Sequence, residues 1–157
     1  MNRVAVTLMV ATFVLIASCG PQKVDVEAER AQVKAVLDHY VTAVETEDME
    51  LYASHMTHEP MMMNFGGFGG PIVGWDALKE TMEGQNAALS ETKIKVSDLA
   101  IHVSEEGKLA WATCLWNLKA MMGENPIELP IRCTWVLEKR DNKWQIVHFH
   151  KSMAQAG

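Results

Sequence analysis

The sequence has few of the residues that commonly carry chemistry, and these shortages narrow its possible functions. It holds three cysteines among 157 residues, and no two of them form the CxxC pair that is typical of a zinc site. It has no Gly-x-Ser-x-Gly segment of the kind that presents a serine nucleophile. Its net charge is −6, and it has no run of lysine or arginine that would form a basic patch. We therefore predict no metal site, no cofactor and no nucleic-acid partner.

No hydrophobic run is long enough to cross a bilayer, but a shorter one opens the chain. Arg3 precedes an apolar segment from Val4 to Ile16, whereas a membrane-spanning helix needs ~20 residues. The following Ala17-Ser18-Cys19, together with Ile16, resembles the bacterial lipobox, in which cleavage before the cysteine allows its thiol to take a lipid. The other interpretation is an ordinary signal peptide with a chance cysteine.

The lipobox interpretation predicts both the location and the domain boundaries. Residues 1–18 would be a lipoprotein signal peptide, Cys19 the lipidation site and residues 19–28 a short polar tether. The protein would then be exported and lipid-anchored to a bacterial membrane, on the periplasmic side or at the cell surface. The remaining residues 29–157 fit one globular domain, because 48% of the chain is hydrophobic and 22% is charged.

The spacing of apolar residues predicts helices first and strands afterwards. Between Glu29 and Glu47, apolar residues recur every three or four positions, which predicts an amphipathic helix. A second, short helix is expected over residues 49–56, and a third begins at Gly74-Trp75-Asp76. From Lys93 onward the apolar period changes to two, which indicates successive antiparallel strands. We therefore predict an α+β fold.

Two local features are expected within the strand region. A change of phase at Ser97-Asp98 predicts a β-bulge. A hairpin centred between Gly123 and Glu124 would place Cys114 opposite Cys133. An exported protein meets oxidising conditions, so these two thiols are a candidate disulfide, although directly opposed strand positions strain its geometry.

A second hairpin is predicted in the segment from Ile131 to Met153. A polar turn at residues 140–143 separates two runs rich in β-branched and aromatic residues. An even-length loop would place Trp135 opposite His148 and turn Arg132 toward the other face of the sheet. An odd-length loop would shift the register by one residue and exchange these partners.

The stretch from His55 to Gly70 is rich in methionine, histidine and glycine. Its imidazole and thioether groups suit Cu(I), but neighbouring side chains of an extended segment point to opposite sides and do not converge on one ion. We therefore expect the methionines to fill an irregular core or to line an apolar pocket. The glycines before Pro71 are expected to form a loop, which lacks the lysine of a phosphate-binding loop.

The last hairpin also carries a family resemblance. Arg132-x-Thr134, a polar turn, Trp144 and His148-Phe149-His150-x-Ser152 resemble the end of a SnoaL-like domain. Such domains belong to the nuclear transport factor 2-like superfamily, with ketosteroid isomerases and the association domains of calmodulin-dependent kinases. The resemblance implies a strongly curved antiparallel sheet wrapped around the N-terminal helices, which is a cone-shaped α+β barrel. It also implies an open cavity that receives a small ligand.

Because this scaffold hosts binding proteins and enzymes alike, two functions are in play. An isomerase of the ketosteroid type needs a carboxylate base and a neutral oxyanion donor. The only tyrosines are Tyr40 and Tyr52, and no acidic residue falls at an obviously inward strand position. We therefore predict no catalytic residue and a noncatalytic domain that binds an unknown small molecule and forms, as one option, a homodimer through the outer face of its sheet. The alternative is a ketosteroid isomerase-like enzyme that acts on a small apolar substrate.

The resemblance also suggests the residues of the pocket. The kinase association domains have arginine-bearing cavities, so Arg132 is predicted to orient a carboxylate group of the ligand. The assumed registers put Trp116 and His148 on the face opposite Arg132, so a single pocket would require a bulge or a slip. The predicted ligand-binding residues are Tyr52, His55, Met63, Trp116, Arg132 and His148.

Overall fold

The structure is a computed structural model that describes residues 24–153. The predicted signal peptide, the lipid attachment at Cys19 and residues 19–23 of the predicted tether lie outside the described residues. Within residues 24–153, no helix is both long enough and apolar enough to cross a membrane.

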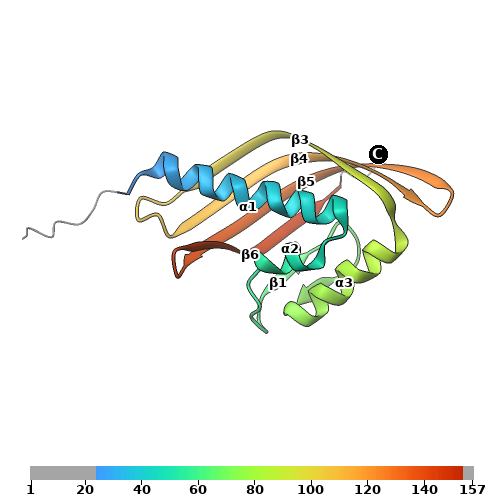
Figure 1. The fold of residues 1–157 in the computed structure, drawn as a ribbon, viewed down its shortest axis with the longest axis horizontal. Helices are drawn as coiled ribbons and strands as arrows, with labels where there is room; N and C mark the ends of the chain where they lie inside the picture. Colours follow the sequence, from blue (N-terminus) through green and yellow to red (C-terminus); the bar gives the residue numbers. More distant parts are fainter. Residues whose placement is uncertain (1–23, 154–157) are drawn as a thin grey trace, which may run out of the picture.

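In this part of the chain, helices pack against one six-stranded sheet (Figure 1). The elements are α1 (Val26–Thr46), α2 (Met49–Ser54), β1 (Met63–Phe65), β2 (Pro71–Val73), α3 (Trp75–Ala88), β3 (Ser90–Val103), β4 (Leu109–Met122), β5 (Asn125–Arg140) and β6 (Lys143–Ser152). The spatial order is β2-β1-β6-β5-β4-β3, with β1 parallel to β6 and the other neighbours antiparallel. The sheet curls around α1 without closing, which confirms the predicted α+β fold and leaves an open cone rather than a closed barrel.

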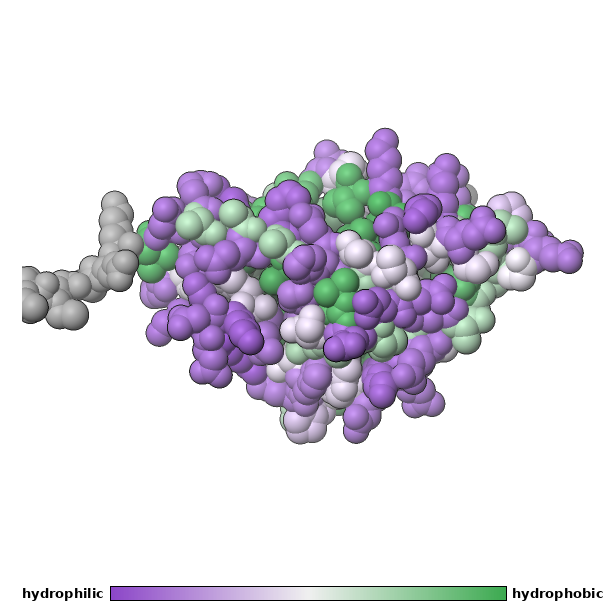
Figure 2. All heavy atoms as spheres, in the orientation of Figure 1, coloured by the Kyte–Doolittle hydropathy of each residue, from purple (hydrophilic) through white to green (hydrophobic). Residues whose placement is uncertain are grey.

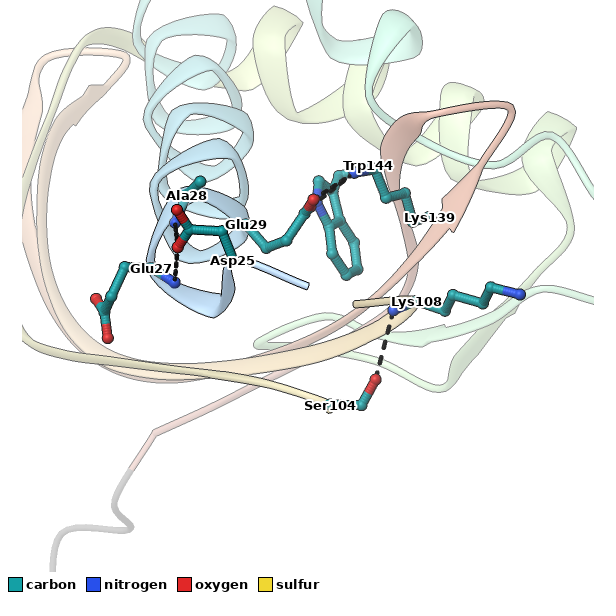
Figure 3. Close-up of polar contacts among 8 residues, drawn as sticks. All are labelled: Asp25, Glu27, Ala28, Glu29, Ser104, Lys108, Lys139 and Trp144. Atoms are coloured by element: carbon teal, nitrogen blue, oxygen red, sulfur yellow. Dashed lines mark hydrogen bonds and ion pairs between the residues drawn. The ribbon is translucent and has the colours of Figure 1, made fainter. Parts of the chain in front are cut away.

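The first helix forms because its first turn is capped and its apolar residues share one stripe. The Asp25 side chain accepts hydrogen bonds from the backbone N–H groups of Glu27 and Ala28, both at 3.1 Å (Figure 3). The face of the molecule drawn in Figure 2 is mostly hydrophilic, with only small apolar patches. The apolar stripe of α1 is turned into the core, where it buries Val33, Val36, Leu37, Tyr40, Ala43 and Val44.

A partly buried ion pair fastens the first turn of α1 to the sheet (Figure 3). Lys139 Nζ on β5 lies 2.6 and 2.8 Å from the two carboxylate oxygens of Glu29. The indole N–H of Trp144 on β6 donates to the same carboxylate at 2.8 Å. The hydrogen bond from Lys139 holds the pKa of Glu29 below its ordinary value, although burial acts in the opposite direction. These contacts fix the start of α1 against the last two strands.

Two short strands in the methionine- and glycine-rich stretch are not anticipated by the sequence. β1 pairs with β2 and meets β6 in parallel at Phe65 and His150. The side-chain carbonyl of Asn64, on β1, accepts a hydrogen bond from the backbone N–H of Phe149 at 2.9 Å. A strand of three residues is too short for its alternation to be read from the sequence. The glycines between β1 and β2 form the expected loop.

The β4–β5 hairpin and the β3 bulge follow the predictions. Cys114 pairs with Cys133, in the predicted register. Both cysteines are free thiols in the structure, and no disulfide joins them. The register of β3 shifts between Ser97 and Ala100, and Asp98 adopts a positive φ of 54°, as a bulge at this point requires.

The β5–β6 hairpin departs from its predicted register. Asp141 and Asn142 have φ angles of 49° and 60°, which form the tight two-residue turn that the even-length prediction assumed. However, Val147 is left without a partner on β5, and this bulge shifts all later pairs by one residue. Trp135 therefore lies opposite Phe149, and the prediction that it faces His148 is wrong.

The bulge decides which β6 side chains face the concave side of the sheet. Beyond Val147, Phe149 and Lys151 are buried among the core residues. His148 is half-buried and His150 is exposed, both on the outer side. Without the bulge, the two histidines would occupy the inner face in place of Phe149 and Lys151.

Candidate ligand-binding site

A pocket with mainly apolar walls lies between the end of α1, α3, the β1–β2 loop and the concave face of β4 and β5. Its volume is about 270 Å³, close to the lower limit of ~300–1,000 Å³ that is typical of small-molecule sites. We call it the Lys151 pocket, because Lys151 is the one charged residue among its described lining residues. These are Val44, Gly67, Phe68, Gln85, Ala88, Leu89, Trp116, Leu118, Met122, Ile127, Leu129, Ile131 and Lys151.

The amine of Lys151 is enclosed by aromatic rings. Its Nζ lies 4.6 Å from the ring centre of Trp116, 4.9 Å from that of Tyr40 and 5.0 Å from that of Phe149. These distances allow cation–π attraction when the amine is protonated. Nζ also makes a 2.9 Å hydrogen bond with the hydroxyl oxygen of Tyr40. Among the ion pairs of residues 24–153, none involves Lys151.

Burial makes this lysine easier to deprotonate. Only 9% of Lys151 remains exposed, and desolvation penalises its charged form. The pKa of Lys151 is therefore lowered from 10.5 to about 8, although the nearby thiols of Cys133 and Cys114 act in the opposite direction. Near neutral pH the amine is mostly protonated, but it loses its proton more readily than a lysine in water.

Two buried tyrosines lie one behind the other next to the Lys151 amine, Tyr40 in contact with it and Tyr52 in contact with Tyr40. The hydroxyl oxygens of Tyr40, on α1, and Tyr52, on α2, lie 3.3 Å apart, and both side chains are 1% exposed. Burial raises the pKa of both phenols; Tyr52 adds to the rise for Tyr40, whereas the hydrogen bond with Tyr40 acts in the opposite direction for Tyr52. Both tyrosines therefore stay neutral over the ordinary pH range. A neutral phenol can donate a hydrogen bond to an uncharged amine or accept one from an ammonium group.

A pair of thiols lies on the other side of Lys151. Cys133 is the cross-strand partner of Lys151 on β5, and Cys114 is the next along this row on β4. The hydrogen bond between the two thiols, together with burial, raises the pKa of Cys133. Cys133 is therefore neutral near pH 7. The same hydrogen bond lowers the pKa of Cys114, so negative charge on this pair would lie on Cys114.

Trp116 contributes its indole ring to the pocket wall. Its side chain is 2% exposed, and its indole N–H has no nitrogen or oxygen acceptor among the described residues. The nearby Cys114 sulfur is only a weak acceptor. A buried donor without a good acceptor is uncommon in native structures, because leaving it unpaired costs free energy. Because this indole nitrogen is itself buried, Trp116 contributes mainly apolar ring surface to the pocket wall, and the amine of Lys151 is the charged group of the lining.

Comparison with known proteins identifies the family. A family model described as a SnoaL-like domain matches residues 33–156. The chain belongs to the SnoaL-like family. No curated protein matches it significantly.

Solved structures share the fold of this SnoaL-like chain. A presumed dehydratase of the NTF2-like family from Streptomyces avermitilis has a TM-score of 0.75 at 16% identity and covers 83% of this chain and 99% of its own. An NTF2-like superfamily protein from Salmonella enterica has a TM-score of 0.74 at 23% identity, with 83% and 95% covered. A ketosteroid isomerase-like protein from Erwinia carotovora has a TM-score of 0.68 at 16% identity, with 82% and 98% covered. At these identities the likeness establishes the fold alone.

The structure brings only some of the predicted site residues to the Lys151 pocket. Trp116 lies in its wall. Tyr52 is buried behind the pocket and reaches it only through Tyr40. His55 is half-buried outside the pocket lining, where its Nε2 lies 2.9 Å from Nδ1 of His39. Desolvation, and then the neighbouring His39, lower the pKa of His55.

Three predicted residues are on the wrong side of the sheet. Arg132 is exposed on the outer face and donates to the backbone carbonyl of Met153 at 3.0 Å. His148 lies on the outer face because of the β6 bulge, with its Nδ1 2.6 Å from the Met63 carbonyl oxygen. Met63 is 45% exposed, whereas its neighbour Met62 is 4% exposed and fills the core. The outward position of Arg132 follows from the inward positions of its neighbours on β5, since strand side chains alternate.

Sequence reasoning missed Lys151 and Tyr40 as site residues. Tyr40 falls on the apolar stripe of α1, whose spacing predicts burial and gives no sign of a polar role. Lys151 follows Phe149 by two positions and therefore shares its face of the strand. An inward Phe149, which its size and apolar character favour, would have indicated an inward Lys151.

We expect Lys151→Met to stabilise the ligand-free protein at pH 7. Methionine removes a buried charge that lacks a counter-ion, and such replacements often stabilise by about 1–4 kcal/mol. Between pH 8 and 10.5 the unfolded protein binds more protons at this site than the folded protein, so wild-type stability rises with pH across this window. The advantage of the variant should therefore shrink as the pH approaches 10.5.

Urea unfolding at pH 7 and at about pH 10 measures both effects. The matched control is Lys139→Met, which removes the partner of the partly buried Glu29 and should destabilise the protein by about 1–3 kcal/mol at pH 7. A Lys151→Met protein that is less stable than wild type at pH 7 would contradict the account of an uncompensated buried amine.

Proposed function

We propose that this SnoaL-like domain binds a small, largely apolar molecule with a carboxylate or a similar acceptor group, and that it does so without turnover. The ligand would place its apolar part against the walls of the Lys151 pocket and its acceptor group against the Lys151 amine. The observation that carries the proposal is the buried amine without a carboxylate partner.

The electrostatics of the pocket support an anionic ligand. A buried charge is stable only when it is paired, or when its pKa shifts until it is neutral. The pKa of Lys151 is lowered, but only to about 8, so its side chain is still mostly charged at pH 7. A ligand carboxylate would supply the missing negative charge. A ligand that carries a carboxylate is therefore proposed from the structure as from the sequence, but with Lys151 and not Arg132 as the residue that binds this group.

The apolar walls support a ligand with an aromatic or aliphatic body. Leucine, isoleucine and methionine side chains from β4 and β5 form the inner surface, and Phe68 from the β1–β2 loop lies at its border. Burial of apolar surface contributes about 25 cal/mol per Å². The small volume limits the ligand to a compact molecule rather than a peptide or a long lipid.

A second candidate function is isomerase-like proton transfer on a small apolar ketone. The specific observation in its favour is the 2.9 Å contact between a lysine of lowered pKa and a neutral phenol. An uncharged Lys151 amine would remove a proton next to the ketone carbonyl, while Tyr40 would donate to the carbonyl oxygen. Turnover of such a ketone that disappears in Lys151→Met would move the protein to this class.

We expect carboxylate binding to depend on Lys151 and not on Arg132. A suitable probe is 2-naphthoate, titrated into the protein at pH 7 and followed by isothermal titration calorimetry. Loss of a partly buried charged partner costs about 2–5 kcal/mol, so Lys151→Met should weaken binding by about 30-fold or more. Arg132→Ala, on the outer face, should leave the affinity unchanged. Equal affinity of wild type and Lys151→Met would rule out the role given to this amine.

We further propose that the domain is lipid-anchored through Cys19 at a bacterial membrane. The support is the apolar segment that leads into Ala17-Ser18-Cys19. The helix α1 has 21 residues and is therefore about 30 Å long, and the Lys151 pocket contains Val44 from its far end. An anchor before α1 would hold the pocket away from the lipid surface.

Expression of Cys19→Ala tests this anchor. We expect wild type to fractionate with membranes and to carry acyl chains by mass spectrometry, because two lipid chains or more hold a protein firmly at a bilayer. The variant should lose the acyl mass and leave the membrane fraction. A wild-type protein that lacks acyl chains would refute the anchor without affecting the pocket.

A further inference from the structure

We propose that Lys151 captures small apolar aldehydes covalently, as an imine formed inside the Lys151 pocket. This inference rests on the proposed binding function and narrows the class of ligand to reactive carbonyl compounds.

The geometry around Lys151 suits a nucleophilic amine. Its Nζ is the one primary amine in the described pocket lining, and its polar contact is the single hydrogen bond to Tyr40. Lys139 provides a contrast, because its amine is held at 2.6 Å by the carboxylate of Glu29. An ion pair of that kind keeps an amine protonated and unreactive, whereas the contacts of Lys151 are aromatic rings and one neutral hydroxyl group, none of which is an anion.

The protonation state supports the same role. Desolvation lowers the pKa of Lys151 to about 8, so a substantial share of the amine is neutral in mildly alkaline solution. The groups that face it are Tyr40 from α1, with Tyr52 of α2 behind it, Cys133 from β5 and Cys114 from β4. Tyr40, Tyr52 and Cys133 all have a raised pKa and stay neutral. Cys114 differs, because the hydrogen bond from Cys133 lowers its pKa, and it is the one facing thiol that can carry negative charge. No described neighbour of the amine is a carboxylate.

Imine formation at this site needs no external oxidant or reductant. The lone pair of the Lys151 nitrogen attacks the aldehyde carbon, a C–N bond forms, and the carbonyl π electrons move to oxygen. That oxygen takes one proton from the Tyr40 hydroxyl, and the nitrogen returns one proton to Tyr40. The carbinolamine then loses its hydroxyl group and a proton as water, and a C=N bond remains. Apolar walls favour the imine, because they disfavour the return of water.

Reductive trapping tests the proposal on the folded protein. The probe is 2-naphthaldehyde with sodium cyanoborohydride, which converts an imine to a stable secondary amine. The modified protein should gain the mass of the aldehyde less one oxygen atom, and peptide mapping should place the first equivalent on Lys151. Hemithioacetals of Cys133 or Cys114 are not trapped by this reagent and are lost on denaturation.

We expect Lys151 to react about tenfold faster or more near pH 7.5 than an ordinary exposed lysine, because much more of its amine is neutral. The rate at Lys151 should level off above about pH 8. Lys151→Met should lose the fast phase, while Lys119→Met, an exposed lysine on the outer face of β4, should keep it. Excess 2-naphthoate should protect Lys151 in the wild-type protein, which tests the site even if Lys151→Met does not fold.

The outcomes separate the two proposals. If 2-naphthoate binds but labelling shows no preference for Lys151, imine capture is wrong and carboxylate binding stands. If 2-naphthoate does not bind but Lys151 is still labelled first, the amine is a reactive carbonyl site and the carboxylate proposal fails. If 2-naphthoate does not bind and labelling shows no preference for Lys151, both proposals are wrong.

Discussion

The burial of one lysine amine is the constraint on which the site depends. It exists because Val147 bulges out of the β5–β6 ladder and exchanges the faces of all later residues of β6. The same bulge places Phe149 and Lys151 inside and sends His148 and His150 outward. A charged group on the concave face costs free energy, and this cost is the physical basis of the proposed binding of an acceptor group and of the proposed reaction with carbonyl compounds.

Contacts elsewhere in the fold position the elements that bury this amine. The ion pair between Glu29 and Lys139 fixes the start of α1. Farther along the helix, Tyr40 is thereby held within hydrogen-bonding distance of Lys151. The side chain of Asn64 binds the backbone N–H of Phe149, which ties β1 to the inward part of β6. The Lys151 pocket is bordered by α3, the β1–β2 loop and the concave face of β4 and β5.

Much of the fold can be predicted from the sequence, because it follows from local periodicity. The apolar stripe of α1 and the period-two pattern after Lys93 each reflect a pattern within a few neighbouring residues. The pairing of Cys114 with Cys133 follows from the position of the turn between β4 and β5. The faces of β6 could not be predicted in this way. A single unpaired residue reverses them, and nothing in the identity of Val147 distinguishes it from an ordinary strand residue. The register without a bulge predicts an inward His148 and gives no sign of an inward Lys151. The prediction for Arg132 has a different basis, because it rests on analogy with an arginine-bearing cavity and not on the alternation of its own strand.

The central claim is that the Lys151 amine is desolvated, and its own titration tests this most directly. The signals of the carbon next to each lysine nitrogen can be followed by NMR in protein labelled with ¹³C-lysine, and the Lys151 signal is assigned by its absence in Lys151→Met. The account requires a Lys151 midpoint at about 8, well below the value of about 10.4 for a lysine in water. A midpoint at or above about 10 would mean that water reaches the amine freely, and the account of the pocket would then be wrong.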